Sequence, residues 1–436
     1  MKQRSILKRP LWRFAFSFLL FGLPLLLLPI RGAWADGIVP GYVLARVRDG
    51  ASISDVIKAI NGDDDDDAED TLILEQVPNT NIYALRLPAG TTETRFANRL
   101  RTIPAIQHAE PDTFFGDPKT LPFERKPSPI AENRNVSDYI SQGASILELQ
   151  AAGVVTEAYV HQVAYRQVRL GAVHSLATGE GIKVAVLDTG VNPEHPALYG
   201  RCTQGFNAIN KDLPPLDMPD GVTNYSVGHG TMVAGMVARI APQADIVPVR
   251  VLNGDGWGSG LNVIKGIVFS QSEGCRVINL SLSSATRLRI MDESIAQAIS
   301  QGILIVTSAG NDGVNQPRWP AAYPGVMAVA SLDTNGQRSP FSNYGSYISV
   351  CAPGNGIHGP FHTGGYALWS GTSFAAPFVA GQAALMFSRN ASLTGATVRA
   401  YIRNTARSVA AANPNSAGLL GAGLIDIERA VRNTPR

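Results

Sequence analysis

The chain has 436 residues, which on a soft prior of roughly 150 residues per domain predicts two or three domains. Hydrophobic residues make up 45% of it and charged residues 17%, as in an ordinary globular protein. The net charge of +2 gives no electrostatic reason to expect nucleic acid as a partner.

The N-terminus has the pattern of a targeting segment. A basic stretch, Lys2–Arg13, precedes an apolar stretch, Phe14–Ile30, and Ala-Trp-Ala at 33–35 then supplies a small-x-small cleavage pattern. Residues 1–35 are therefore predicted to be a signal peptide, removed near Asp36, of a secreted or periplasmic protein. An uncleaved membrane anchor is the alternative, and no stable membrane partner is expected.

Residues 36–115 contain two similar units, each a strand followed by a turn and an amphipathic helix. A short apolar strand between them and a closing strand complete a β-α-β-β-α-β pattern, which predicts a small ferredoxin-like α+β domain. The predicted elements are Tyr42–Val47, Ile53–Ile60, Leu72–Val77, Ile82–Leu87, Thr92–Ile103 and the IQHAEPD run at 106–112. The acidic run at 62–70 is interpreted as a solvated loop rather than a binding site.

Pro, Lys, Glu and Asn dominate the stretch that follows, 116–135, as is typical of an exposed linker. We predict a linker over 116–160, within or just after which the mature enzyme begins.

From residue 161 to 436, apolar strands alternate with helical stretches. The strands are expected at 182–187, 245–251, 276–282, 304–308 and 326–331, and the helices at 231–239, 261–270 and 291–301. This alternation predicts an α/β domain, a doubly wound and mostly parallel sheet with helices on both faces. Ligands bind such folds at the carboxyl ends of the strands, and Asp188 ends the first strand.

Three short motifs each place one reactive side chain among glycines and small residues. They are AVLDTGV around Asp188, GHGTMVAG around His229 and SGTSFAAP around Ser373. A hydroxyl is a poor nucleophile until a base takes its proton, and an imidazole is a good base when a carboxylate fixes its tautomer. The order Asp, His, Ser is one of the known chain orders of such a triad. A fourth motif, VTSAGNDG, carries Asn311 between the histidine and the serine.

With these motifs the chain resembles the subtilisin-like serine peptidases, or subtilases, over about residues 165–430. The resemblance implies a subtilisin-like fold and an exported serine endopeptidase that hydrolyses peptide bonds through an acyl-enzyme on Ser373. His229 would act as general base and acid, Asp188 would orient it, and Asn311 would donate a hydrogen bond to the oxyanion.

Residues 36–115 in turn resemble the inhibitory propeptides that precede such catalytic domains. The chain is therefore expected to be a zymogen and a monomer. Its expected partners are polypeptide substrates and its own propeptide, which would inhibit it intramolecularly.

The resemblance also indicates where a substrate would lie. The GWGSG stretch at 256–260 would be an edge strand that pairs with an extended peptide, and 281–283 and 308–310 would form the walls of the primary pocket. The residues assigned to substrate binding are Gly256, Gly258, Ser259, Ser281, Leu282, Ser283, Ser308, Ala309, Gly310 and Arg318.

Alignment on the Tyr-Pro pair that follows it puts Arg318 near the floor of this pocket. A guanidinium there could fill the pocket and favour small side chains, or pair with a Glu or Asp before the scissile bond. A side chain turned out to solvent is the third interpretation.

The chain departs from the family pattern at Met232, where a second histidine is frequent, and at Ser283 and Ser284, where glycines are frequent. The run 229–251 also leaves no room for the insertion that carries the strong calcium site in many relatives. No metal or cofactor is therefore expected, and calcium held by another loop, within 207–226, is the alternative.

The three cysteines leave at least one thiol unpaired within the chain, and no CxxC or clustered His/Cys spacing indicates zinc. Cys275 and Cys351 lie in apolar, strand-like surroundings and are predicted to be buried and inert, while the pairing of Cys202 stays open. Four other histidines are predicted to be surface or loop residues: His174, His195, His358 and His362.

Two further functions fit the same motifs. A subtilisin-like transamidase or macrocyclase would pass the acyl group to an amine instead of water. A non-catalytic inhibitor or scaffold would keep the triad silent under a locked propeptide.

Overall fold

The computed structural model describes residues 37–61, 72–116, 147–149 and 158–436. The predicted signal peptide, the acidic loop and most of the predicted linker lie outside these residues. Within them, no helix combines the length and the apolar character needed to cross a bilayer.

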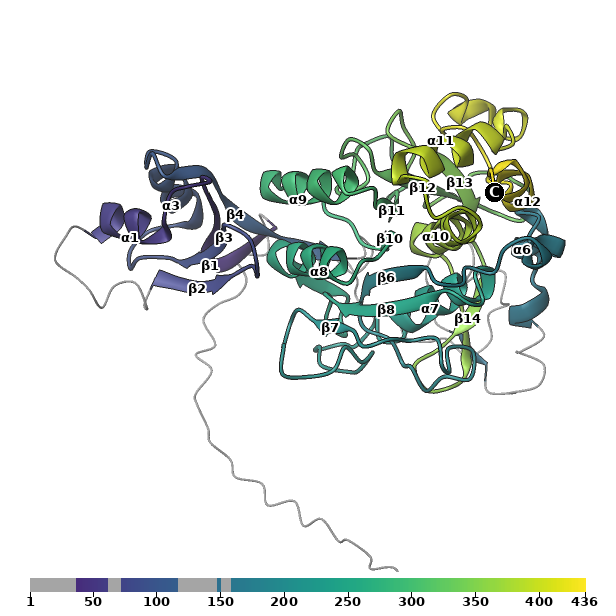
Figure 1. Cartoon of the computed structure of the whole chain (residues 1–436), viewed down its shortest axis with the longest axis horizontal. Helices are drawn as coiled ribbons and strands as arrows, with labels where there is room; N and C mark the ends of the chain where they lie inside the picture. The colour runs from purple at the N-terminus through teal and green to yellow at the C-terminus, as the bar shows by residue number, and fades with distance from the viewer. Residues whose placement is uncertain (1–36, 62–71, 117–146, 150–157) are drawn as a thin grey trace, which may run out of the picture.

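A small α+β domain forms the N-terminal part of the described chain (Figure 1, purple and blue). Its elements are β1 (Ile38–Val47), α1 (Ile53–Asn61), β2 (Ile73–Gln76), β3 (Ile82–Arg86), α3 (Glu93–Leu100) and β4 (Ile106–Gly116). The strands pair antiparallel in the order β2-β3-β1-β4. Apolar residues of both helices, such as Val56 and Phe96, pack against the sheet in a core of their own. The predicted ferredoxin-like arrangement is confirmed.

A seven-stranded sheet in the order β13-β12-β11-β10-β6-β8-β7 is the centre of the larger body. Every neighbouring pair in it is parallel. Its strands are β6 (Lys183–Asp188), β7 (Phe206–Asn207), β8 (Asp245–Arg250), β10 (Val277–Leu280), β11 (Leu304–Ser308), β12 (Met327–Leu332) and β13 (Val350–Pro353). The chain adds β8 and β7 on one side of β6 and the other four strands on the opposite side. The switch point therefore lies at β6, whose last residue is Asp188.

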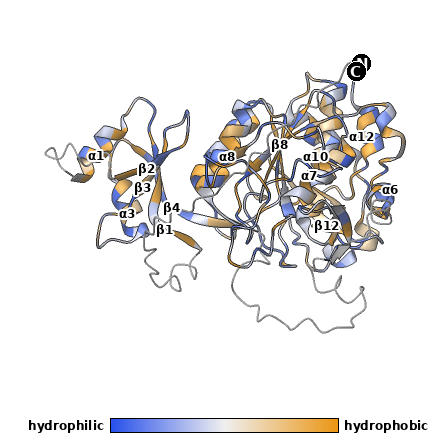
Figure 2. Ribbon diagram, turned by 90° about the horizontal axis from the view of Figure 1, so that it is seen from below, coloured by the Kyte–Doolittle hydropathy of each residue, from blue (hydrophilic) through white to orange (hydrophobic). Residues whose placement is uncertain are grey.

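Helices cover both faces of this sheet. They are α6 (Val163–Gln167), α7 (His229–Ile240), α8 (Gly260–Ser272), α9 (Arg289–Ser300), α10 (Thr372–Arg389), α11 (Gly395–Thr405) and α12 (Ile427–Asn433), with single turns at Gly171–Ser175, Ala410–Ala412 and Pro414–Ser416. Residues of α7 and α10 share one core with Val184 and Val186 of β6, whereas α8 and α9 share the other with Ala185 and Leu187. Figure 2 shows the hydrophobic stretches of α7, α10 and β8 inside the larger body. The predicted doubly wound α/β fold is confirmed.

Four short strands complete the described sheets. β14 (Ile357–Pro360) and β15 (Tyr366–Trp369) form a hairpin, and β5 (Leu147–Leu149) pairs antiparallel with β15. β9 (Trp257–Ser259) pairs with β4, so the sheet of the small domain continues into the larger body.

All three cysteines are free thiols, and Cys275 and Cys351 are buried, as predicted. Burial raises the pKa of Cys275 to about 12, which leaves it an inert thiol at neutral pH. Two histidine predictions are wrong in part. His358 lies on β14 and is half-buried. His195 lies in a turn but is fully buried, where its Nε2 contacts the Gly365 carbonyl at 2.7 Å and its ring packs edge-on against Tyr366.

Candidate active site

The end of β6 and the start of α7 bring Asp188 and His229 together. His229 Nδ1 lies 2.7 Å from Asp188 Oδ1, and both side chains are buried. The backbone N–H of Thr189 donates to the same carboxylate oxygen at 2.8 Å. This arrangement fixes the imidazole tautomer, with Nδ1 bound to the carboxylate and Nε2 left to act as the base.

The glycines on either side of His229 are needed for this approach. Gly228 precedes α7 with φ of 97°, and a Cβ there would lie 2.2 Å from the Phe361 ring. A Cβ on Gly230 would lie 2.1 Å from the Gly190 carbonyl oxygen. Side chains at either position would push α7 away from the end of β6.

Ser373 is the second residue of α10, where backbone N–H groups lack partners within the helix. Its Oγ donates to the Ser281 carbonyl at 3.3 Å, and Ser281 Oγ donates to the Ser373 carbonyl at 2.8 Å. The ring of the next residue, Phe374, packs against the His229 imidazole with centroids 5.2 Å apart, and Trp369 packs on it at 5.7 Å. The first turn of α10, which carries the predicted nucleophile, thus packs against the predicted base.

Asn311 lies against the first residue of α10. Its Oδ1 accepts hydrogen bonds from Thr372 N at 2.8 Å and from Thr372 Oγ1 at 2.9 Å. These bonds orient the amide, whose Nδ2 lies 3.5 Å from the position that a Cβ on Gly371 would take. The Asn311 N–H₂ group is therefore close to the start of the helix that carries Ser373, where an oxyanion donor is required.

A strand of the same chain occupies the predicted peptide groove. The last residues of β4 pair antiparallel with β9, Phe114 opposite Ser259 and Gly116 opposite Trp257. On the other side, Gly116 N donates to the Ser283 carbonyl at 3.0 Å and Ser283 N donates to the Gly116 carbonyl at 2.8 Å. The predicted edge strand, 256–260, and one predicted pocket wall, 281–283, thus hold an extended peptide between them through backbone hydrogen bonds.

Phe115 is the anchor of this strand. It is fully buried and shares a core with Leu252, Leu261, Leu282 and Leu288. An aromatic side chain in this register thus enters an apolar pocket of the larger body.

Two acidic residues attach the small domain beside the groove. Glu110 Oε1 accepts from Ile290 N at 2.7 Å in the first turn of α9, and Asp112 Oδ2 accepts from Leu261 N at 3.1 Å in the first turn of α8. Both side chains accept hydrogen bonds from backbone N–H groups that have no partner within their own helices. His108 adds a contact between its Nε2 and Glu293 Oε1 at 2.6 Å.

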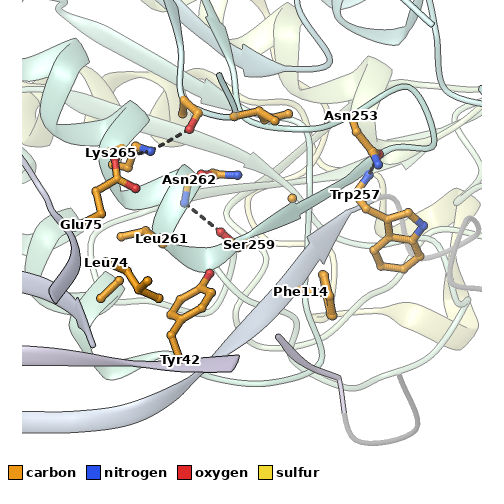
Figure 3. A pocket seen from close by; sticks show the side chains of 14 residues that line it. Tyr42, Leu74, Glu75, Phe114, Asn253, Trp257, Ser259, Leu261, Asn262 and Lys265 are labelled. Atoms are coloured by element: carbon orange, nitrogen blue, oxygen red, sulfur yellow. Dashed lines mark hydrogen bonds and ion pairs between the residues drawn. The ribbon is translucent and has the colours of Figure 1, made fainter. Parts of the chain in front are cut away.

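A cavity of about 430 Å³ lies at this junction, away from the triad (Figure 3). Figure 3 shows Tyr42 and Glu75 reaching into it from the small domain, opposite Lys265 of α8. Lys265 Nζ lies 2.8 Å from Glu75 Oε1 and donates to the Ala208 carbonyl at 2.7 Å. These contacts fasten the small domain to α8, and no residue of the triad lines the cavity.

Arg318 lies at the second predicted pocket wall, 308–310, which begins at Ser308, the last residue of β11. The Arg318 Cγ is 2.9 Å from the position of a Cβ on Gly310, and its Nε and Nη2 each lie 2.8 Å from Asp312 Oδ2. The guanidinium is therefore paired within the chain, an arrangement that the sequence did not predict. The wall itself is tied to the nucleophile helix, because Gly310 N donates to Thr372 Oγ1 at 3.2 Å.

Sequence reasoning missed several residues that hold the site. Thr189, Thr372 and Asp217 form its buried hydrogen bonds, and Glu110 and Asp112 attach the small domain. Thr189 follows Asp188 and Thr372 precedes Ser373 in the motifs, so the sequence could have marked their hydroxyls as hydrogen-bonding partners within the site.

A model of the subtilase family matches residues 179–423, more than half of the chain. Thermitase of Thermoactinomyces vulgaris is 38% identical over 241 residues, which cover 53% of this chain and 83% of thermitase. Subtilisin BL of Lederbergia lenta is 36% identical over 276 residues, which cover 61% of this chain and 97% of that protein.

Solved structures agree with these matches. A protease of Pseudoalteromonas arctica PAMC 21717 superposes with a TM-score of 0.56 at 32% identity, over 62% of this chain and 94% of its own. Fervidolysin of Fervidobacterium pennivorans, a keratinolytic enzyme related to subtilisin, shares the fold over 91% of this chain and 62% of its own, with a TM-score of 0.70 at 24% identity. The chain therefore belongs to the subtilase family, and it is a serine-type endopeptidase.

Proposed function

We propose that Ser373 attacks the scissile carbonyl while His229 takes its proton, and that water then resolves the acyl-enzyme with His229 acting again as base and acid. The buried Asp188–His229 contact at 2.7 Å, next to the start of α10, is the observation that supports these roles. Asn311 and the Ser373 backbone N–H would bind the oxyanion of each tetrahedral intermediate.

Hydrolysis is favoured over the two alternative functions. The relatives include proteins described as alkaline protease and thermostable alkaline protease, whose names describe cleavage rather than ligation. Mass spectrometry of products from a peptide with a free amine acceptor distinguishes the outcomes: hydrolysis gives two fragments, whereas transamidation gives a joined or cyclic product.

We propose further that residues 36–115 are an intramolecular inhibitor and that the protein is an exported zymogen, monomeric after maturation. The signal-type N-terminus supports export. Occupation of the groove by β4, together with the Glu110 and Asp112 contacts to α9 and α8, supports inhibition, because a substrate strand needs the same backbone partners.

The isolated small domain, 37–116, is expected to inhibit the mature enzyme in trans, since it has its own core. Phe115→Ala should raise its inhibition constant roughly ten- to hundredfold, because the fully buried ring loses its apolar contacts. Steady-state inhibition of peptide cleavage measures both. Phe114→Ala serves as the control, with a smaller effect expected, because that ring makes an edge-on contact with Trp257 and is only partly buried. Absence of any inhibition by the wild-type domain would contradict the assignment.

Arg318→Ala is expected to widen the primary pocket. For peptides with Phe or Leu before the cleaved bond, kcat/KM should rise about tenfold, the order expected for added apolar volume, while peptides with Ala should change little. A peptide library profiled with both enzymes measures this. Asp312→Asn is the companion variant, since it releases the guanidinium and should add cleavage after Glu and Asp. Identical profiles for wild type and Arg318→Ala, with large apolar residues preferred by both, would remove Arg318 from the pocket.

We also propose that no strongly bound calcium stabilises the fold. Three carboxylates in or against the loop 207–226 already have partners: Asp217 accepts hydrogen bonds, Asp220 pairs with Arg250, and Asp255 accepts from the loop backbone. A chelator should therefore barely change the melting temperature. Loss of an ion bound at a thousandfold excess over Kd would cost about 4 kcal/mol, or about ten degrees. Such a drop, reversed by calcium but not by magnesium, would contradict the proposal.

A further inference from the structure

A second buried carboxylate lies beside the catalytic pair. Asp217, in the loop that leads to α7, is 7% exposed. Its Oδ1 accepts from Thr189 Oγ1 at 3.0 Å and from Gly228 N at 2.9 Å. Its Oδ2 accepts from Thr231 N at 3.0 Å and from Thr231 Oγ1 at 2.7 Å. All four bonds come from donors, which suits the ionised carboxylate.

These partners belong to the two elements that carry the catalytic pair. Thr189 directly follows Asp188 at the end of β6, and Gly228 directly precedes His229. Thr189 Oγ1 also accepts from Gly230 N at 2.9 Å. The Asp217 carboxylate therefore joins the end of β6 to the first turn of α7, at the place where Asp188 and His229 meet.

The backbone that carries Asp217 lies tightly against β6. A Cβ on Gly190, where φ is 107°, would lie 2.4 Å from the Leu216 carbonyl oxygen and 2.7 Å from Asp217 N. Val191 N also donates to the Pro215 carbonyl at 3.0 Å. The segment around Asp217 thus has little freedom to move away from the turn after Asp188.

Arg250 fixes the same segment from the neighbouring strand. It is 1% exposed and pairs in register with Asp188 across β8 and β6. Its Nη1 donates to the Leu216 carbonyl at 3.0 Å, its Nη2 donates to the Met218 carbonyl at 3.3 Å, and Nη2 lies 2.6 Å from Asp220 Oδ1. A buried cation therefore holds the loop on both sides of Asp217.

Asp217 also adds negative charge next to the pair. Burial raises the pKa of Asp217, and its hydrogen bonds with Gly228 and Thr231 oppose that rise. A negative charge behind Asp188 favours the imidazolium that forms when His229 takes a proton.

We propose that Asp217 is a positioning residue of the peptidase reaction: it holds the residues next to Asp188 and His229 in register and stabilises the charged form of the imidazole. It touches neither substrate nor the reacting atoms. Its effect reaches the reaction through the Asp188–His229 contact.

The test is Asp217→Asn. This substitution keeps the shape of the side chain and removes its charge, and it puts an N–H₂ group against the N–H and O–H groups that donate to the native carboxylate. With active sites counted by a fluorophosphonate probe, kcat per active site should fall about ten- to hundredfold with KM unchanged. The acid limb of the kcat/KM profile should move to lower pH, because loss of a neighbouring negative charge lowers the pKa of His229. An unchanged kcat, or a fall in kcat with an unmoved acid limb, would overturn the proposal.

Asp255→Asn is the matched control. Asp255 supports the outer part of the same loop, accepting from Thr223 N at 2.7 Å and from Asn224 N at 2.6 Å. Both kcat and the acid limb should stay as in wild type; an equal shift in this variant would overturn a specific role for Asp217.

If Asp217→Asn does not fold, Thr231→Val and Thr231→Ser test the same contact. The valine removes the hydroxyl that donates to Asp217 at 2.7 Å, so kcat should fall about fivefold, and the serine should recover most of that loss. Equal activity of the valine and serine variants would overturn the proposal.

Discussion

Replacing Ser373 by alanine is expected to abolish peptide cleavage and labelling by a fluorophosphonate probe. Without the hydroxyl there is no acyl-enzyme, and kcat should fall by about 10⁶-fold, a magnitude known for a subtilisin and carried over here. The variant should also accumulate as the unprocessed precursor after signal removal, because β4 already lies in the groove of its own enzyme. Gel labelling and N-terminal sequencing measure the two effects.

Ser370→Ala is the control for this variant. Ser370 lies three residues earlier, and its Oγ accepts from Gly356 N at 2.9 Å rather than contacting Ser281. It should label and mature normally. Persistent labelling of Ser373→Ala would remove the assigned nucleophile, and normal processing of that variant would point to a separate maturing protease.

Asn311→Ala is expected to lower kcat by about 10²- to 10³-fold with little change in KM, because the amide would bind the oxyanion of the tetrahedral intermediate and not the ground-state carbonyl. Steady-state kinetics on a peptide substrate measure the split between kcat and KM.

Asn311→Asp separates this role from support of the helix. The aspartate keeps an acceptor for Thr372 N and Oγ1, at 2.8 and 2.9 Å in the native chain, but loses the N–H₂ donor. Both variants should therefore be impaired. If the aspartate variant kept wild-type kcat, Asn311 would serve only to hold Thr372.

The parts of the fold and site that the sequence predicted are those with a local signal. The buried strands of the parallel sheet are continuous apolar runs, and each catalytic side chain sits in its own motif. The motifs also required glycines at 228 and 230, where the structure shows no space for a Cβ. The two-residue strand β7 was missed because Phe206–Asn207 is too short to form a pattern.

The contacts that the sequence did not predict join distant segments. Asp112 reaches α8 across 149 positions and Glu110 reaches α9 across 180, so nothing near either residue reveals its partner. Arg318 and Asp312 are close in sequence, but whether they pair depends on the direction in which the long arginine side chain points. The sequence does not determine that direction. Asp217 lies in an irregular loop, where no periodicity marks a buried residue.

The carboxyl groups of Asp112 and Glu110, which attach the small domain, make the affinity of this attachment depend on pH. The ordinary pKa of Asp112 is 3.8, and burial against α8 raises it to about 6 in the bound domain; burial raises the pKa of Glu110 as well. Because its pKa is higher in the bound domain, the carboxyl keeps a proton there that it loses in the separated domain. Its contribution to the binding affinity is therefore fully present below pH 3.8, and it is lost as the pH rises through about 6. These two carboxyl groups therefore hold the small domain more tightly in acid than near neutral pH.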